Sequence, residues 1–213
     1  MNELALRAEI IATAIRMNER RINTGKSGNV SARTETGFLI TPTGLAYESM
    51  RPEDIVAVTL AGAASGPRLP SSEWRFHRDI YVDRPDASAI VHAHSSFATT
   101  LACLGRGIPA FHYMIAVAGG KDIRCAPYAT FGTQELSDGA LAALSGRRAC
   151  LLANHGMIAM DASLEAALAL AIEVEALAEQ YWRVLQIGAP NLLSDAEMNI
   201  VLEKFKSYGQ PAS

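Results

Sequence analysis

The chain has 213 residues, of which 49% are hydrophobic and 19% are charged, and its formal net charge is −3. These values are ordinary for a soluble globular protein, and they exclude the strongly basic balance that binding to nucleic acid or an anionic membrane requires. Its apolar runs are all shorter than the ~20 residues that a membrane-spanning helix needs. We therefore expect a single domain over residues 1–213, with neither a nucleic acid nor a membrane as partner.

The N-terminal residues and the cysteines indicate the cellular compartment in which we expect the protein. Residues 1–9 are charged and amphipathic, unlike a secretory signal. Cys103, Cys125 and Cys150 are odd in number and lack Cys-x-x-Cys spacing. Buried free thiols in a reducing compartment explain them better than disulfides do, so we expect a cytoplasmic protein.

Local patterns predict the elements of the N-terminal half in chain order. They are an amphipathic helix over 3–21, a turn at 25–31, hairpin strands at 30–33 and 37–40, a turn at 41–44, a helical turn at 51–54, a strand at 55–60, a mobile loop at 61–69 and a helix over 70–83. Ser71 or Ser72 is the expected N-cap of that last helix, with Glu73 in its first turn.

The C-terminal half continues with alternating strands and helices. The expected elements are a strand at 88–94, a helix at 95–104, a strand or helix at 111–118, a strand at 123–126, a helix at 133–144, strands at 149–153 and 157–160, helices over 163–186 and 194–207, and a flexible tail at 208–213. Grouped, partly hairpin-connected strands with helices between them predict one α/β or α+β domain with a mixed or mostly antiparallel central sheet.

One tempting nucleotide motif is excluded. Gly25-Lys26-Ser27 has Arg20 where a P-loop needs its first glycine, and it follows a helix instead of a strand. What remains is a turn with two glycines, Gly25 and Gly28. Its exposed N–H groups can cradle an anion, although a plain helix-to-strand connection explains it as well.

Three histidines predict a metal site. In a strand, residues i and i+2 face the same side, so His92 and His94 can converge on one ion. His155 follows an apolar strand at a turn and is the best candidate for a third ligand. Three imidazoles leave a fourth position open, as in catalytic zinc sites. The alternative is that His92 and His94 are polar residues on the wet face of a strand.

Glu73 and the neighbouring hydroxyls have both a structural and a chemical interpretation. A carboxylate in the first turn of a helix is favoured by the helix dipole. The same helix start offers N–H and O–H donors to a phosphate, with Glu73 placed to act as a base. Both interpretations can hold together. His77 is expected to be a structural or surface histidine, and His112 a buried structural one.

With these residues in view, the chain resembles the class II aldolase/adducin family, and within it the branch that cleaves L-fuculose 1-phosphate. The resemblance covers nearly the whole chain. Its matching segments are Gly28–Ser31, Ile40–Gly44, Leu69–His77, Val91–His94, His112–Ile115, Ala126–Gly132, Asn154–Gly156 and Leu202–Gly209.

The resemblance implies a fold, an assembly and a metal centre. The family fold is a three-layer α/β/α sandwich around a mostly antiparallel central sheet. It forms a homotetramer with active sites between subunits. One Zn²⁺ per subunit would be held by His92, His94 and His155. Glu73 would be a fourth ligand, leaving the metal when substrate binds and then moving a proton.

The resemblance also implies the substrate contacts. The phosphorylated ketose would be held through its phosphate by Asn29, Thr43, Ser71 and Ser72 and by the backbone of Gly28 and Gly44. Tyr113 of a neighbouring subunit would handle the proton of the aldehyde oxygen, Tyr208 and the tail would close the site, and Phe131 would line its aldehyde end. The reaction would be reversible cleavage of L-fuculose 1-phosphate to dihydroxyacetone phosphate and L-lactaldehyde.

Other activities remain open at this point. A 5-deoxy- or 5-methylthio-pentulose 1-phosphate has the same phosphate and ketone ends as L-fuculose 1-phosphate. A pentulose-phosphate 4-epimerase is less favoured, because that branch carries Asp where Glu73 stands. An adducin-like structural module without catalysis would lack the metal histidines, whereas all three are present here.

Overall fold

The structure, a computed structural model, describes residues 2–206. Its helices are α1 (Glu3–Glu19), α2 (Trp74–Asp83), α3 (Ser96–Cys103), α4 (Gln134–Leu144), α5 (Leu164–Ile187) and α6 (Asp195–Phe205). Its strands are β1 (Asn29–Arg33), β2 (Gly37–Ile40), β3 (Val56–Thr59), β4 (Ala64–Ser65), β5 (Ala89–Ala93), β6 (Arg124–Ala126), β7 (Ala149–Leu152) and β8 (Gly156–Asp161). Short 3-10 helices are η1 (Tyr47–Ser49), η2 (Pro52–Asp54) and η3 (Tyr113–Ala118).

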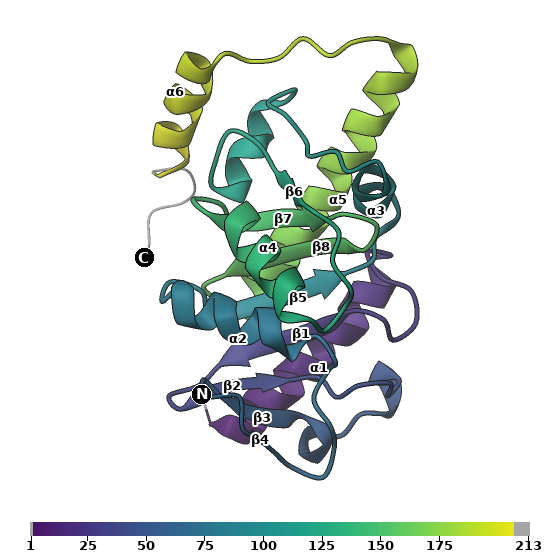
Figure 1. Ribbon diagram of the computed structural model, residues 1–213, viewed down its shortest axis with the longest axis vertical. Helices are drawn as coiled ribbons and strands as arrows, with labels where there is room; N and C mark the ends of the chain where they lie inside the picture. The colour runs from purple at the N-terminus through teal and green to yellow at the C-terminus, as the bar shows by residue number, and fades with distance from the viewer. Residues whose placement is uncertain (1, 207–213) are drawn as a thin grey trace.

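The eight strands form one sheet in the order β4-β3-β2-β1-β5-β8-β7-β6. Among the strand pairs of residues 2–206, only β6 and β7 run parallel. Helices α2 and α4 cover one face, and α1, α3 and α5 cover the other (Figure 1). The predicted three-layer fold with a mostly antiparallel sheet is therefore confirmed. Strands β5 and β8 lie in the middle of the sheet, each paired on both sides.

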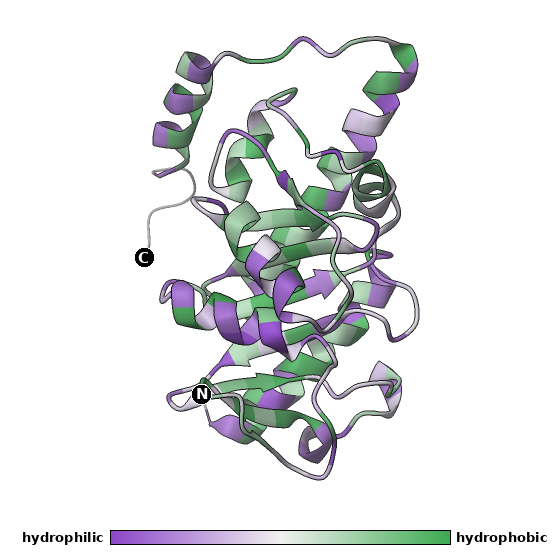
Figure 2. Ribbon diagram, in the orientation of Figure 1, coloured by the Kyte–Doolittle hydropathy of each residue, from purple (hydrophilic) through white to green (hydrophobic). Residues whose placement is uncertain are grey.

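Each face of the sheet has its own hydrophobic core, and strand alternation sorts the side chains between them. On β5, Val91 packs into the core under α1, α3 and α5, whereas Ile90 packs into the core under α2 and α4. Figure 2 shows the central strands as predominantly hydrophobic. By the same alternation His92 points to the α2 side, where its ring lies 5.4 Å from that of Phe76.

Several local expectations were wrong in detail. Helix α2 begins at Trp74 with Glu73 as its N-cap, so neither Ser71 nor Ser72 caps it. The segment 61–69 is not only a loop, because β4 pairs there with β3 at the sheet edge. Residues 113–118 form the 3-10 helix η3. All three cysteines are free, but Cys103 is exposed and only Cys150 is fully buried.

Helix α6 stands at the end of an extended segment that crosses from the end of α5 (Figure 1). The predicted capping box is confirmed, with Ser194 and Glu197 bonded reciprocally. The expected flexible tail 208–213, including Tyr208, lies outside the described residues. That the whole chain forms one domain stays a prediction.

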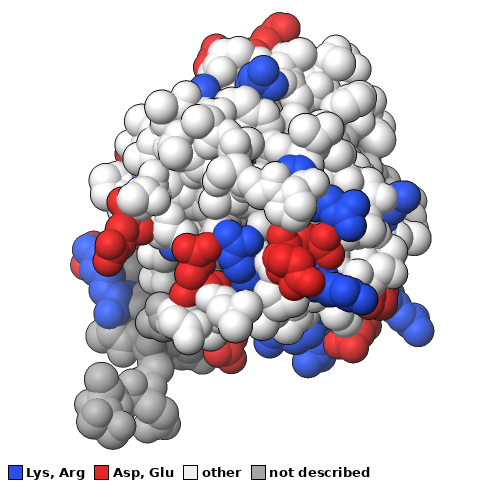
Figure 3. Space-filling model, turned by 90° about the horizontal axis from the view of Figure 1, so that it is seen from below, with Lys and Arg blue, Asp and Glu red and all other residues white. Residues whose placement is uncertain are grey.

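The surface carries both signs of charge. On the face seen in Figure 3, acidic and basic side chains are interspersed. None of the helices within residues 2–206 combines the length and hydropathy that a bilayer crossing requires.

Candidate metal centre and active site

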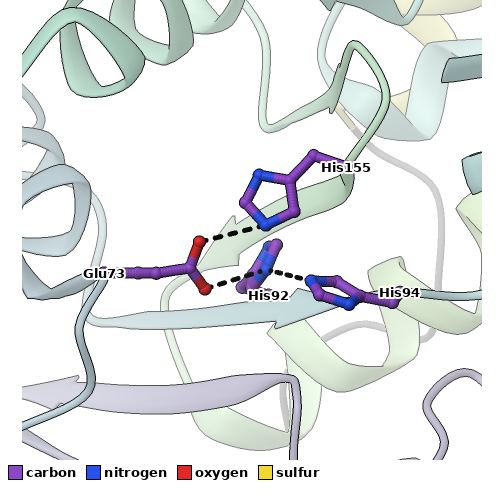
Figure 4. A group of neighbouring side chains, drawn as sticks. All are labelled: Glu73, His92, His94 and His155. Atoms are coloured by element: carbon purple, nitrogen blue, oxygen red, sulfur yellow. Dashed lines mark hydrogen bonds and ion pairs between the residues drawn. The ribbon is translucent and has the colours of Figure 1, made fainter. Parts of the chain in front are cut away.

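Four side chains predicted to bind metal converge on one point (Figure 4). His92 Nε2 lies 3.0 Å from His94 Nε2 and 3.2 Å from Glu73 Oε2, and His155 Nε2 lies 3.0 Å from Glu73 Oε1. One ligand atom from each residue lies within 4.8 Å of all the others. Four ligands at zinc distances of 2.0–2.1 Å in a tetrahedron would be about 3.4 Å apart. The spacing therefore fits a single metal ion.

Hydrogen bonding leaves lone pairs, not protons, facing this point. His92 Nδ1 lies 2.9 Å from the carbonyl oxygen of Met157, so Nδ1 carries the proton and Nε2 presents a lone pair. Glu73 Oε1 is buried and makes no hydrogen bond of normal geometry within residues 2–206. Converging lone pairs and a buried carboxylate repel one another unless a cation lies between them. The donor set therefore fits a divalent metal.

The charge states also suit a metal. Burial alone would raise the pKa of Glu73, but positive charge at this point, which the imidazoles of His92 and His155 carry when they are protonated, outweighs burial and holds that pKa well below its usual range. Burial, together with His92 and His155, lowers the pKa of His94 to about 4. At neutral pH the carboxyl group is therefore ionised and His94 is neutral, which are the states that bind metal.

Tight backbone packing brings the ligand segments together. The turn before β8 places Asn154 in the left-handed region with φ 56°, and it projects His155 toward β5. A Cβ on Gly156 would lie 2.5 Å from the carbonyl oxygen of Ala93. Glycine is thus required directly after His155, which explains the Asn-His-Gly sequence.

Glu73 reaches the metal point from the start of α2, which covers the sheet face to which His92 points. The backbone N–H of Trp74 donates to the carbonyl of Ser71 at 3.1 Å, and the Glu73 N–H donates to Ser71 Oγ at 3.3 Å. This turn precedes α2 and aims Glu73 at the histidines. Glu73 is therefore the N-cap residue of α2 and not, as was expected, part of its first turn, and its side chain points to the histidines instead of capping the helix.

The residues expected to bind phosphate lie on segments that are packed side by side. The Thr43 N–H donates to the Leu69 carbonyl, and the Ser71 N–H donates to the Thr41 carbonyl. A Cβ on Gly28 would lie 2.6 Å from the His92 carbonyl oxygen, so this turn is pressed against β5.

These expected phosphate ligands differ in solvent exposure and in whether other residues already use their hydrogen-bonding groups. Thr43, Gly44 and Ser72 are exposed, whereas Ser71 is buried. Asn29 is buried, and both ends of its amide are engaged by Glu73 and His77. Phosphate binding by this group stays a prediction.

A cavity of about 280 Å³ opens beside the metal point. Its lining combines polar groups near the metal with aromatic groups farther out: Ser27, Ser72, Glu73, His94, Tyr128, Ala129, Phe131, Asn154 and His155. Phe131 is among the lining residues, whereas Tyr113, which is 51% exposed, is not; the aldehyde-end role of Phe131 stays a prediction.

Four lining residues were not expected from the sequence: Ser27, Tyr128, Ala129 and Asn154. Two signals could have found some of them. Asn154 directly precedes a metal ligand, and Tyr128 lies in the segment 126–132 that carries the family resemblance. Ser27 gave no signal beyond its place next to Gly28.

Comparison with known proteins decides the family. Residues 8–182 match the model of the class II aldolase and adducin N-terminal domain. The chain belongs to the class II aldolase and adducin family. It is a class II aldolase, a carbon–carbon lyase of a metal-dependent class, and its histidine–glutamate cluster has the ligand types and spacing that can hold a metal ion.

Named relatives of this class II aldolase differ in substrate. A 5-methylthioribulose-1-phosphate/5-deoxyribulose-1-phosphate aldolase of Rhodospirillum rubrum is 58% identical over 99% of this chain and 96% of its own. An L-fuculose phosphate aldolase of Escherichia coli K12 is 51% identical over 98% of both chains. A solved L-fuculose 1-phosphate aldolase superposes with a TM-score of 0.91 at 44% identity, covering 94% of this chain and 95% of that one.

Proposed function

We propose that this aldolase is a zinc enzyme that cleaves a ketose 1-phosphate to dihydroxyacetone phosphate and a short aldehyde. The observation that carries the proposal is the convergence of three imidazoles and one carboxylate beside a cavity with neutral hydrogen-bond donors. Neutral donors suit a phosphate monoester, and the metal point lies where the adjacent ketone would reach. Free thiols are consistent with a cytoplasmic location.

In this proposal, different residues bind the phosphate, stabilise the developing negative charge and transfer protons. Ser71, Ser72 and Thr43, with the backbone of Gly28 and Gly44, would hold the phosphate. A divalent ion at the histidines supplies positive charge that stabilises the oxyanion left by cleavage. When the bond between carbons 3 and 4 breaks, its electrons stay on carbon 3.

Glu73 is the proposed acid for that carbon. Its carboxylate, ionised in the resting site, would take up a proton from solvent when substrate binds and deliver it to carbon 3, which completes dihydroxyacetone phosphate; in the reverse direction it would remove that proton. Its position 3.0 to 3.2 Å from two of the imidazoles places it within reach of a bound ketose.

The second proton transfer requires another subunit in this proposal. A base must take the hydroxyl proton at carbon 4 as the aldehyde leaves. Tyr113 is exposed and lies outside the cavity lining of its own chain. We therefore assign this step to Tyr113 of a neighbouring copy in a homotetramer, with Tyr208 helping to close the site.

Three substrates of two kinds are candidates. L-Fuculose 1-phosphate is favoured by the motif resemblance and by the structural neighbour. A 5-methylthio- or 5-deoxy-ribulose 1-phosphate is favoured by the relative at 58% identity. The exposed rings of Tyr128 and Phe131 at the cavity also favour the latter, because thioether sulfur packs well against aromatic rings.

The test is a coupled assay for dihydroxyacetone phosphate with each substrate, using protein of measured metal content. Release that stops with a chelator and returns with Zn²⁺ supports the proposal, and the ratio of kcat/KM values identifies the substrate. Ser71→Ala is expected to raise KM. Zinc-loaded protein that releases no dihydroxyacetone phosphate from any of the three substrates would overturn the proposed function.

A further inference from the structure

A chain of buried hydrogen bonds leads away from Glu73 into the core under α2. Asn29 Nδ2 donates to Glu73 Oε2 at 2.9 Å, and Asn29 Oδ1 lies 2.5 Å from His77 Nε2. Ser31 Oγ lies 2.7 Å from His77 Nδ1 and 2.8 Å from the Tyr81 hydroxyl. All five residues are at most 4% exposed. A buried histidine is thus connected to the proposed acid through one amide.

The chain arises from two regular spacings. Glu73, His77 and Tyr81 are four residues apart and share one side of α2, beginning at its N-cap. Asn29 and Ser31 are two apart on β1 and share one face of the sheet. Because this side of α2 packs on that face of β1, the two polar rows interlock. Apolar residues at these positions would fill the same space without the cost of burying five polar groups.

The direction of every bond in the chain follows from its carboxylate end. Ionised Glu73 can only accept, so Asn29 must present its NH₂ to Glu73 and its oxygen to His77. His77 Nε2 must then carry a proton and donate it to that oxygen. His77 Nδ1 is left as an acceptor from the Ser31 hydroxyl, whose oxygen accepts from Tyr81. Each group has one role, and reversing any bond leaves two donors or two acceptors facing each other.

We propose that His77 is a positioning residue for the aldol reaction, holding the Asn29 amide in the one orientation that donates to Glu73. This inference rests on the proposed role of Glu73. Without a directing donor, the Asn29 amide can turn over and present its oxygen to the carboxylate, which repels it. Glu73 then loses the hydrogen bond from Asn29 that holds Oε2 in place while the Glu73 carboxyl group transfers a proton to or from carbon 3. An amide has two N–H donors, so Asn29 can still offer its second to substrate.

The surroundings of His77 support a neutral ring of this form. Burial, with a contribution from His92, lowers the pKa of His77 to about 3. Its ring stacks on Phe76 with centroids 4.6 Å apart, which fixes the ring plane. A neutral ring has one N–H and one lone pair, which is what the two neighbours require.

Two amide substitutions separate the positioning role from packing. In His77→Gln the longer side chain can reach Asn29 and keep the donor that Nε2 provides. In His77→Asn the shorter side chain can still accept a hydrogen bond from the Ser31 hydroxyl, but it cannot reach Asn29. We expect His77→Asn to lower kcat at least about tenfold at unchanged zinc content, and His77→Gln to stay within about threefold of wild type. Equal losses in both, or a normal kcat in His77→Asn, would overturn the proposal.

A second measurement needs neither activity nor a variant that folds well. In wild-type protein labelled with ¹⁵N at its five histidines, long-range ¹H–¹⁵N spectra distinguish the two tautomers of each ring. We expect His77, in metal-free and zinc-loaded protein alike, to be protonated at Nε2 only. Protonation at Nδ1, or at both nitrogens, would refute the direction of the chain. If wild-type enzyme cleaves none of the substrates, the proposed function fails while this spectrum still tests the hydrogen-bond chain.

Discussion

Glu175 on α5 is expected to anchor the start of α3, the helix that directly follows His94. Its carboxylate accepts three hydrogen bonds, from Ser95 Oγ at 2.6 Å and from the backbone N–H groups of Phe97 and Ala98 at 2.8 and 2.9 Å. Ser95 itself makes no side-chain cap, so Glu175 satisfies the helix N-terminus from another element.

The magnitude follows from counting these bonds. In Glu175→Gln, the side-chain oxygen can still face Ser95 and Ala98, but an NH₂ group replaces the oxygen that faces the Phe97 N–H. One bond to a charged acceptor is lost, at about 1.5–3 kcal/mol. Glu175→Ala loses all three, and we expect a decrease of about 4 kcal/mol in the free energy of unfolding.

The assay is urea unfolding of metal-free protein at one fixed protein concentration, so that any association contributes equally. Glu173→Gln is the matched control. Glu173 lies two residues earlier on the same helix, and its carboxylate accepts no hydrogen bond from a helix N-terminus within residues 2–206. We expect this substitution to change the free energy of unfolding by no more than about 0.5 kcal/mol. A Glu175→Gln variant as stable as this control would refute the anchoring role.

Three further predictions concern the metal centre. His155→Ala should sharply lower zinc content by elemental analysis, because it removes one of three imidazoles; full occupancy would contradict its role as ligand. Glu73→Gln should retain zinc but lose about 10²–10⁴-fold in kcat, since an amide cannot move the proton, and near-normal turnover would argue against it. Gly28→Ala should cost about 1–3 kcal/mol in urea unfolding, because its Cβ would lie 2.6 Å from the His92 carbonyl; unchanged stability would show that the turn can yield.

Local spacing was enough to predict the three histidines of the cluster as candidate ligands. The two-residue period of His92 and His94 lies within a strand whose alternation is visible in the sequence, and a strand end followed by Gly156 marks His155. These features depend on neighbours along the chain. The resemblance to the family added Glu73, whose place next to the histidines no local pattern could give.

What the sequence could not predict depends on packing between distant segments. His77 was expected to be structural or at the surface, because its partners Ser31 and Asn29 lie on β1, 46 and 48 residues away. The start of α2 was misplaced because the carbonyl of Ser71, instead of a serine hydroxyl, accepts from Trp74. The cavity contribution of Tyr128 likewise depends on how one loop lies against another.

The central position of β5 and β8 has a consequence for the order of folding. His92 comes from β5, yet the bond that sets its tautomer comes from Met157 on β8, 65 residues later. Loops of that length close late, because their entropic cost precedes any contact that offsets it. We therefore expect the complete ligand set to form only after β8 has paired with β5. A nascent chain that ends before β8 would lack a complete metal site. A metal ion bound at these residues would therefore stabilise a sheet that has already formed, and would not nucleate its folding.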